Sequence, residues 1–297
     1  MRYIQLPWLA FEMPTIRVDG IDFHVEEFGG GPPLFLLHGF TGSSASWAPI
    51  GDDFTRRHRV IAIDLIGHGA TSAPADPSRY AFERALDDLV EIADQFGVAR
   101  ASWLGYSMGG RLALGLALRY PLRVSALILE SATAGIQDDE GRRQRAEEDD
   151  GLANRIEDVG VEAFVDEWAG LPMWESQCVL PAEVRQHQHD IRLRNRAIGL
   201  ANSLRGMGQG VQPSYWDRLQ EIDFPVLLIA GALDRKYSGI AGQMGIRIPE
   251  ATLTMVPGAG HAVHLEQPKQ FTDEVIEFLA IRESIETGNV QGGDRWT

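Results

Sequence analysis

The stretch GYSMGG at residues 105–110 decides the fold of this chain. It follows an apolar run at 101–104 and opens a pattern of helical period at 108–119. A G-x-S-x-G sequence between a buried strand and a helix is typical of a nucleophile elbow, a strained turn that exposes the serine oxygen. The motif positions two residues before and two residues after Ser107 must be small, because larger side chains there would collide across the turn. On this stretch alone, a glycine-rich turn with an incidental serine remains an alternative.

Apolar runs of strand length recur on both sides of this turn, at 34–37, 60–63, 126–129 and 226–229. Runs that are apolar on both faces predict a parallel sheet covered by helices. Segments of helical period lie between these runs, for example at 82–96. An alternating segment at 15–28 predicts a hairpin before the first buried strand. The order therefore predicts an α/β fold with a mostly parallel central sheet flanked by helices.

Residues 134–212 interrupt this alternation of strands and helices. They contain no convincing strand pattern, and they begin with a charge-dense run at 138–150. We therefore predict an inserted helical lid between two parts of an α/β core, residues 1–133 and 213–282. The last residues, 283–297, are polar and glycine-rich, which predicts a flexible tail.

The charge balance argues against several classes of partner. The 297 residues contain 27 Lys and Arg against 42 Asp and Glu, a net charge of −15 with a pI near 4.9. Such a chain repels nucleic acid and anionic lipid, so we expect neither a nucleic-acid nor a membrane partner. The single cysteine, Cys178, offers no internal disulfide and no cysteine-rich metal site. We expect a cytoplasmic protein, and the sequence gives no oligomeric state.

Two loop residues complete a chemical pattern with Ser107. Asp234 follows the buried run at 225–233, and His261 follows another short strand in the segment PGAGH. Serine, aspartate and histidine in this order, each at the carboxyl end of a strand, are typical of a hydrolase-type triad. The His261 imidazole accepts the Ser107 proton only if its other nitrogen is held as a donor, which Asp234 would do. Ser107 is therefore predicted to act as a base or nucleophile.

A further loop predicts an oxyanion hole. The segment HGFTG at 38–42 follows the strand run at 34–37. The main-chain N–H groups of Phe40 and Met108 are the expected donors, each worth about 3 kcal/mol of transition-state stabilisation. His38 is interpreted as a histidine that holds the loop through hydrogen bonds.

With these motifs in register, the chain resembles the α/β-hydrolase superfamily over nearly its whole length. The lid motifs are more specific: Leu193-Arg194-Asn195, residues 199–208 (GLANSLRGMG), and Gly135-Ile136-Gln137. Together with DRKY at 234–237, they resemble the menaquinone-pathway synthase family that makes 2-succinyl-6-hydroxy-2,4-cyclohexadiene-1-carboxylate (SHCHC).

This resemblance implies a lyase and not a hydrolase. It implies removal of a proton next to a succinyl ketone, followed by 2,5-elimination of pyruvate from an enolpyruvyl precursor that carries three carboxylates. Ser107, activated by His261 and Asp234, would be the base, and the oxyanion hole would hold the developing enolate. No cofactor is implied, and the expected ligand is a small anionic substrate.

The position of Arg111 independently supports an anionic ligand. It falls in the first turn of the helix after Ser107, where a cation faces the positive end of the helix dipole at a cost of about 0.3–1 kcal/mol. A bidentate pair with a substrate carboxylate would explain the arginine. The alternatives are a solvated side chain and an ion pair with an acidic lid residue.

The other proposed ligand residues follow from the resemblance. Arg145 and Arg194 would hold the remaining carboxylates, although the charge-dense run around Arg145 is also typical of a solvated helix face. Arg192 and Arg196 lie two residues from Arg194 and are expected to face elsewhere. A pocket-lining role and a plain packing role both remain open for two aromatic residues, Tyr106 and Trp168.

Two other functions remain open at this level. A serine carboxylesterase or carbon-carbon bond hydrolase would use the same triad through an acyl-enzyme. A ligand-binding protein on the same fold would retain the triad without turnover. Convergence of the arginines on one pocket would favour the lyase, because an apolar acyl pocket would leave those charges buried and unpaired.

Overall fold

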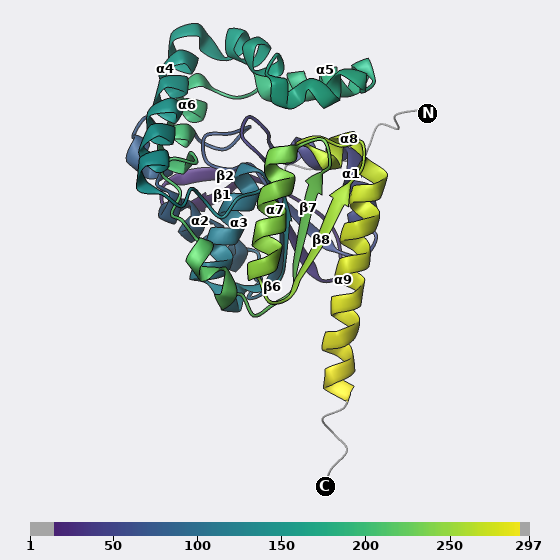
Figure 1. The fold of residues 1–297 in the computed structure, drawn as a ribbon. Coiled ribbons are helices and arrows are strands. Elements are labelled where there is room, and N and C mark those ends of the chain that lie inside the picture. Colours follow the sequence, from purple (N-terminus) through teal and green to yellow (C-terminus); the bar gives the residue numbers. More distant parts are fainter. Residues whose placement is uncertain (1–14, 292–297) are drawn as a thin grey trace.

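An eight-stranded sheet forms the centre of the protein in the computed structural model, which describes residues 15–291 (Figure 1). The strand order is β1-β2-β4-β3-β5-β6-β7-β8. The first two strands form an antiparallel hairpin, β2 pairs antiparallel with β4, and all other neighbours are parallel. The strands are β1 (Thr15–Val18), β2 (Ile21–Gly29), β3 (Pro33–Leu37), β4 (Arg59–Ile63), β5 (Ala101–Tyr106), β6 (Val124–Glu130), β7 (Val226–Gly231) and β8 (Ala251–Val256).

Helices cover both faces of this sheet, so the predicted α/β architecture with its mostly parallel sheet is confirmed. On β3, Phe35 and Leu37 pack into the core on one face, and Leu34 and Leu36 pack into the core on the other. Alternate residues of a strand point to opposite faces, which explains why the run is apolar throughout. One face is covered by α2 (Phe82–Gln95), α3 (Met108–Arg119) and α7 (Arg235–Arg247), and the other by α1 (Ala48–Thr55), α8 (Val263–Glu266) and α9 (Pro268–Gln291).

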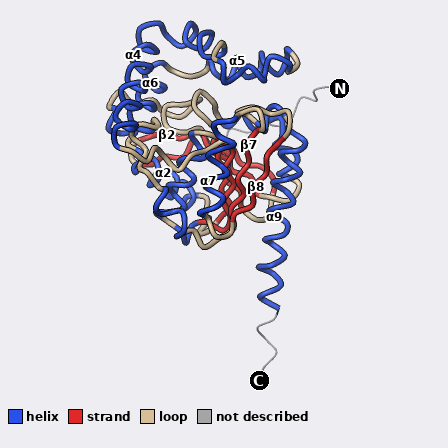
Figure 2. Tube along the Cα trace, in the orientation of Figure 1, coloured by secondary structure: helices blue, strands red, loops and turns tan. Residues whose placement is uncertain are grey.

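Only helices lie between β6 and β7. The 3₁₀ segment η6 (Trp216–Glu221) directly precedes β7, and the helices before it are α4 (Asp139–Ala169), the 3₁₀ segment η5 (Pro172–Val179), α5 (Ala182–Leu193) and α6 (Ala197–Met207). We refer to residues 139–207 as the cap, because these helices lie across one end of the sheet (Figures 1 and 2). Within α4, Gly160 has φ 79° and ψ 170°, a conformation that only glycine adopts without strain, and the helix kinks there.

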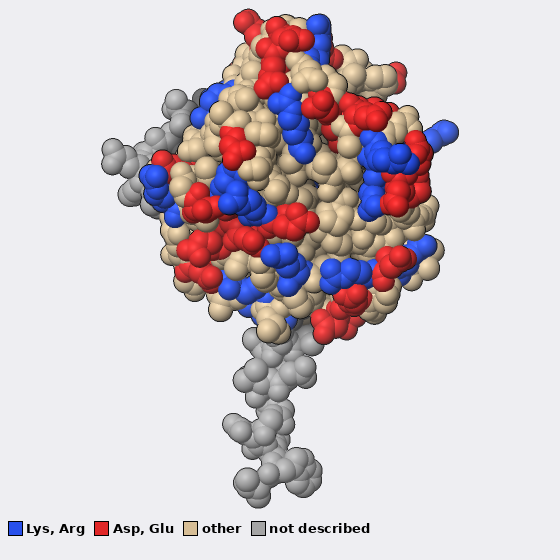
Figure 3. All heavy atoms as spheres, turned by 90° about the vertical axis from the view of Figure 1, so that its left-hand side faces the viewer, with Lys and Arg blue, Asp and Glu red and all other residues tan. Residues whose placement is uncertain are grey.

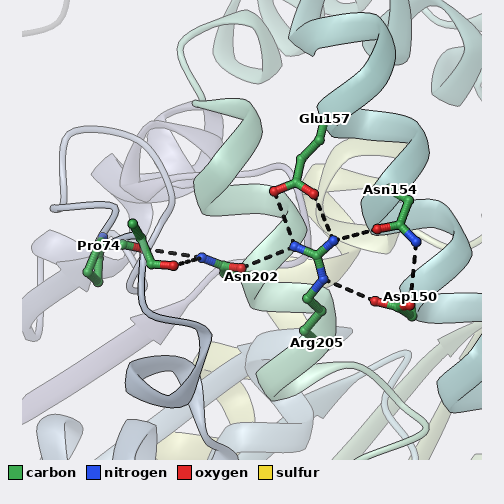
Figure 4. A network of polar contacts seen from close by, with 7 residues as sticks. Pro74, Asp150, Asn154, Glu157, Asn202 and Arg205 are labelled. Carbon is green, nitrogen blue, oxygen red and sulfur yellow. Dashed lines mark hydrogen bonds and ion pairs between the residues drawn. The ribbon is translucent and has the colours of Figure 1, made fainter.

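A polar network joins two cap helices to each other and to the core (Figure 4). The Arg205 guanidinium on α6 donates hydrogen bonds to side chains of α4 and to a neighbour on its own helix, namely Asp150, Asn154, Glu157 and Asn202. The Asn202 amide in turn donates to the main-chain oxygens of Pro74 and Ala75, at 3.2 Å each. The network therefore fixes the α4–α6 pair above the 74–75 loop of the core.

Acidic and basic side chains are interspersed on the face shown in Figure 3. In the charge-dense run of α4, Arg142 pairs with Asp139 and Arg143 pairs with Glu140, each within one helical turn. Exposed pairs of this kind contribute little to stability. These two arginines therefore behave as the solvated helix face that the run predicts.

The last helix is longer than the sequence suggests. We expected it to end near residue 281, but α9 continues to Gln291. The segment RESIET at 282–287 contains arginine and two glutamates, which are good helix formers. Residues 292–297 of the predicted tail lie outside the described residues. Between residues 15 and 291, no helix has both the length and the apolarity that crossing a membrane requires.

A buried ion pair joins Arg79 to Asp88 on α2, one of the helices that cover the sheet. The Arg79 guanidinium donates to both carboxylate oxygens of Asp88, at 2.8 and 2.7 Å, and the side chains are only 7% and 6% exposed. Asp88→Asn leaves the Arg79 charge buried without its main partner, so the free energy of unfolding should fall by about 3 kcal/mol. Urea unfolding measures this loss. The matched change Glu91→Gln, on the exposed face of the same helix, should cost less than about 0.5 kcal/mol, and equal losses in the two variants would contradict the assignment.

Candidate active site

Ser107 lies at a strained turn between β5 and α3. Its backbone has φ 50° and ψ −106°, and its N–H donates a 2.8 Å hydrogen bond to the main-chain oxygen of Glu130 on β6. A Cβ atom added to Gly105 would lie 2.4 Å from the main-chain oxygen of Gly109, and one added to Gly109 would lie 2.2 Å from that of Leu37. Glycine is therefore required on both sides of the serine, as the motif predicts.

The three residues of the predicted triad are brought together. The Ser107 Oγ lies 3.0 Å from Nε2 of His261, and the opposite ring nitrogen, Nδ1, lies 2.7 Å from Oδ2 of Asp234. His261 is only 2% exposed. Each residue comes from a loop at the carboxyl end of a strand: Ser107 follows β5, Asp234 follows β7 and His261 follows β8. The imidazole is therefore placed to take the Ser107 proton.

Asp234 is held in its charged form. Burial would raise the pKa of this carboxyl group, but hydrogen bonds from His261 and from the Tyr237 N–H, the latter 3.1 Å from Oδ1, outweigh it and lower the pKa. The carboxylate is thus ionised at neutral pH. It keeps the proton of His261 on Nδ1 and leaves Nε2 free to accept from Ser107.

The two predicted oxyanion donors border the same cavity as Ser107. Met108 is the first residue of α3, so its main-chain N–H has no acceptor within the helix. The loop that carries Phe40 is fixed by His38, whose Nδ1–H donates to the Gly39 oxygen at 2.8 Å while Nε2 accepts from the Leu65 N–H at 3.0 Å. His38 therefore holds this loop in place through hydrogen bonds, as the sequence suggests.

The cap also contacts this loop, through a residue whose position the sequence did not reveal. Asn195 follows α5 and is 6% exposed. Its Nδ2 donates to the main-chain oxygen of Thr41 at 2.8 Å, and its Oδ1 accepts from the Gly69 N–H at 3.0 Å. Thr41 follows Phe40 directly and has a φ of 67°. Asn195 therefore links the end of a cap helix to the loop that carries one expected oxyanion donor.

A cavity of about 320 Å³ lies between the triad and the cap. Its size is within the range of small-molecule sites. From the core it is lined by the triad, both expected oxyanion donors and Tyr106, and from the cap by Trp168, Trp174 and Leu204. The Tyr106 ring packs 5.5 Å from that of His261, and the Trp168 ring lies 5.4 Å from that of Phe40. The two aromatic residues singled out in the sequence both line this cavity.

Arg111 is buried at the wall of the cavity. It is 6% exposed, and its Nη1 donates to the main-chain oxygen of Met207 at 2.7 Å. Burial lowers the pKa of the guanidinium to about 10, so it remains protonated at neutral pH. Among the described side chains, residues 15–281, no carboxylate forms an ion pair with it. The structure therefore contradicts a solvated Arg111 and a direct ion pair with an acidic cap residue. Asp149 attracts the guanidinium only from a greater distance, so this buried cation is available for a ligand.

Arg145 lines the cavity beside an acidic neighbour. Its Nε donates to Oδ1 of Asp149 at 2.7 Å, and the Asp149 side chain is 4% exposed. The second Asp149 oxygen accepts from the Gly210 N–H at 3.1 Å. Arg145 thus differs from Arg142 and Arg143 on the outer face of the same helix, because a buried carboxylate orients it along the cavity.

Arg194 is not brought to the cavity, which corrects the expectation for this residue. It is exposed, it caps the end of α5, and it lines none of the described cavities. Arg192 instead is partly buried, with its guanidinium 5.2 Å from the centre of the Trp174 ring. Two residues turn an α-helix by about 200°, so only one of the two arginines faces the core.

Four more polar residues of the cavity were not singled out from the sequence as ligand residues: Ser203, Gln209, Lys236 and Tyr237. Gln209 donates to the Tyr237 hydroxyl at 2.6 Å, and burial raises the pKa of that phenol. Lys236 and Tyr237 belong to the DRKY segment that carries part of the family resemblance, so the motif itself was the available signal. Among the described residues, no three His, Cys, Asp or Glu side chains are grouped as metal ligands.

Comparisons with known proteins agree with this geometry. A family model described as alpha/beta hydrolase fold matches residues 32–268. A protein of Bacillus subtilis (strain 168), provisionally named 2-succinyl-6-hydroxy-2,4-cyclohexadiene-1-carboxylate synthase, is 46% identical over 272 residues, which cover 90% of this chain and 99% of the relative. The synthase of that name from Salmonella typhimurium (strain LT2) is 29% identical, and the match covers 87% of this chain and 98% of the relative.

A solved structure extends the likeness to three dimensions. MenH from S. aureus matches with a TM-score of 0.84 and 33% sequence identity, covering 88% of this chain and 98% of that chain. The elbow, the order of the triad and these matches lead to one assignment. The chain belongs to the alpha/beta hydrolase fold family, in the branch that contains proteins named SHCHC synthase.

Proposed function

We propose that this protein is an SHCHC synthase, a menaquinone-pathway lyase that eliminates pyruvate from 2-succinyl-5-enolpyruvyl-6-hydroxy-3-cyclohexene-1-carboxylate. The observation that carries the proposal is the buried, unpaired Arg111 in the cavity that contains Ser107. The 46% identity to the Bacillus subtilis relative supports the same activity. A tricarboxylate substrate would supply the anion that Arg111 lacks.

In the proposed reaction Ser107 acts as a base. Its Oγ removes the proton on the carbon next to the succinyl ketone while its own hydroxyl proton passes to Nε2 of His261, 3.0 Å away. The imidazolium that forms is stabilised by the ionised Asp234 at its other nitrogen. The electron pair of the broken C–H bond forms an enolate on the ketone oxygen.

The enolate then expels the leaving group. The main-chain N–H groups of Phe40 and Met108 would donate to the enolate oxygen, an arrangement typically worth about 3 kcal/mol per donor. As the ketone reforms, the electrons move through the ring and break the bond between the ring carbon and the enol oxygen. The departing enolpyruvate takes up the proton that His261 received from Ser107 and becomes pyruvate. His261 is then neutral again and Ser107 carries the substrate proton as its hydroxyl proton, so the atoms balance and the step needs no cofactor.

The cations of the cavity would hold the substrate in a fixed orientation relative to the triad. Arg111 is the buried anchor, and Arg145, oriented by Asp149, is the second. Lys236 lines the same cavity and supplies further positive charge. The net charge of −15 repels a trianion at long range, but screening limits that repulsion beyond about 8 Å at physiological salt. Local arginines therefore decide binding.

A serine esterase fits this cavity less well. An esterase needs an apolar pocket for its acyl group, in which the Arg111 guanidinium would stay buried without an anion at a cost of several kcal/mol. The same argument disfavours a carbon-carbon bond hydrolase for a neutral substrate. For the compartment, we propose the cytoplasm, where the exposed Cys178 would remain a free thiol.

The proposal is tested by following both products of the precursor. Purified protein should release pyruvate, detected with lactate dehydrogenase, in equal amount to SHCHC, detected by its ultraviolet absorbance. Pyruvate at the rate of spontaneous decay, or precursor consumed without pyruvate, would contradict the function.

Asn195 should control the rate and not the affinity. Asn195→Ala removes both amide contacts to the 41 and 69 loops, so the Phe40 N–H loses its support from the cap. We expect kcat for pyruvate release to fall about 10- to 100-fold with little change in KM, because small displacements of a catalytic group cost rate. Asn154→Ala, on the outer network of the cap, serves as the control. A rise in KM with unchanged kcat would place Asn195 in substrate binding instead.

A further inference from the structure

Two buried carboxylates beside the triad have no part in the reaction described above. Glu266 ends α8 and is 8% exposed, and Glu130 ends β6 and is fully buried. Neither side chain lines the cavity that contains Ser107, so neither touches a substrate there. Burial of a carboxylate costs free energy unless hydrogen bonds or charges compensate it. The contacts of these two side chains therefore require an explanation.

The Glu266 carboxylate binds the main chain on both sides of His261. Its Oε2 accepts from the Gly260 N–H at 2.6 Å, and its Oε1 accepts from the Ala262 N–H at 3.2 Å. A carboxylate offers an acceptor on each of its two arms, whereas a glutamine amide offers an acceptor on one arm and donors on the other. Glu266 is thus matched to the two N–H groups, and it fixes the peptide groups that flank His261.

Glu130 connects this histidine segment to the serine turn. Its carboxylate accepts from the main-chain N–H of His264 at 3.0 Å and from Nδ1–H of the same residue at 2.9 Å. Its own main-chain oxygen accepts from the Ser107 N–H at 2.8 Å. His264 lies on α8, two residues before Glu266. One residue of β6 therefore holds both the turn of Ser107 and the short helix that carries Glu266.

The His261 segment is also bound to the loop of the third triad residue. The N–H of Leu233 donates to the main-chain oxygen of Ala259 at 2.9 Å, and Leu233 directly precedes Asp234. The main chain around His261 is thus tied to the strand ends that carry both of its triad partners. Its ring position is set by these main-chain contacts together with the two hydrogen bonds of the ring itself.

We propose that Glu266 and Glu130 are positioning residues, which hold Nε2 of His261 at hydrogen-bond distance from Oγ of Ser107. The inference rests on the proposed function, in which His261 receives the Ser107 proton and later gives it to the departing enolpyruvate. The ring must therefore serve two atoms from one position. If the flanking peptide groups move, the 3.0 Å contact with Ser107 lengthens, and such displacements lower the rate more than the affinity.

Glu266→Gln tests this inference with almost no change in side-chain shape. The variant keeps one acceptor but turns its NH₂ group toward the second main-chain N–H, so one of the two hydrogen bonds is lost. We expect kcat for pyruvate release to fall about 10- to 100-fold, with KM within about twofold of the wild type.

Glu130→Gln is the second variant, and its effect should be smaller. The remaining Oε1 still accepts from the His264 N–H, and the His264 ring can carry its proton on Nε2 and accept from the new amide at Nδ1. We expect kcat to fall about 3- to 10-fold. If Glu266→Gln does not fold, this variant decides the question, and a wild-type kcat would then contradict the proposal.

A serine-directed fluorophosphonate gives a readout that does not need the precursor. The Ser107 oxygen forms a bond to phosphorus, fluoride leaves, and the hydroxyl proton passes to His261. The labelling rate, followed by mass spectrometry of the intact protein, should fall about 10- to 100-fold in Glu266→Gln. Labelling reports the Ser107–His261 pair even in a protein that releases no pyruvate, so failure of this inference and failure of the proposed function are distinguishable.

Asp88→Asn is the control for lost stability. Asp88 is also a buried carboxylate, but it pairs with Arg79 and does not line the cavity. This variant should unfold in less urea than the wild type and keep its kcat, KM and labelling rate.

Two results would overturn the proposal. One is a Glu266→Gln protein that unfolds in less urea but keeps the wild-type kcat and labelling rate, because Glu266 would then only stabilise the fold. The other is a rise in KM with unchanged kcat, which would place Glu266 in substrate binding.

Discussion

Ser107→Ala should lower kcat for pyruvate release by about four to six orders of magnitude, the loss typical of removing a triad serine. The reason is that no other hydroxyl among the described residues hydrogen-bonds to Nε2 of His261. KM should change little, because the arginines that hold the substrate remain. The rate is measured with the lactate dehydrogenase coupled assay on protein whose unfolding in urea matches that of the wild type.

Ser131→Ala is the control for this change. Ser131 follows β6 near the same end of the sheet, its hydroxyl is buried without a hydrogen-bond partner among the described residues, and it does not line the cavity. Its loss should leave kcat within about threefold. A Ser107→Ala protein that retained most of its activity would remove Ser107 from the mechanism.

Arg111→Met should raise KM for the precursor and lower kcat/KM by about two to three orders of magnitude. The variant has a side chain of similar length, but it removes a buried cation that forms no ion pair with a carboxylate among the described side chains. Loss of one partner from a buried hydrogen-bonded charge pair typically costs 2–5 kcal/mol, or about 30- to 5,000-fold. Steady-state kinetics with the precursor measure the effect. The kcat/KM of Arg111→Lys should lie between those of the wild type and Arg111→Met, because lysine keeps the positive charge but lacks the paired N–H donors of the planar guanidinium.

Arg142→Met on the outer face of α4 is the control, since Arg142 pairs only with the exposed Asp139. Its kinetics should match those of the wild type. If the protein cleaves a neutral ester, kcat/KM for that ester should fall far less in Arg111→Met than kcat/KM for the precursor does. Equal losses on the anionic and the neutral compound would count against a carboxylate at Arg111.

The centre of the sheet was predictable because its strands, such as β3, β4 and β7, are buried on both faces. Leu34 and Phe35 pack into opposite cores, so the run is apolar without alternation and can be read locally. The elbow was predictable for a similar reason, because close main-chain contacts at the turn require glycine at positions 105 and 109. The order of Ser107, Asp234 and His261 then followed from motifs at strand ends.

Side chains of the cap were harder to predict. Arg192 and Arg194 are the same residue type, and only the packing of α5 against the core decides that Arg192 is partly buried and Arg194 exposed. Asn195 is a second example, because its partner Thr41 is 154 residues away and its partner Gly69 is 126 residues away. Local patterns contain no information about such contacts, so only the family motif pointed to this region.

The central claim is that the triad acts as a base on an anionic precursor and not as a nucleophile on an ester. The most direct measurement runs pyruvate release from the enolpyruvyl precursor beside hydrolysis of a short p-nitrophenyl ester, with one preparation of wild type and Ser107→Ala. The account predicts fast pyruvate release that depends on Ser107, with negligible ester cleavage. Ester cleavage without pyruvate release would contradict it and identify a serine hydrolase.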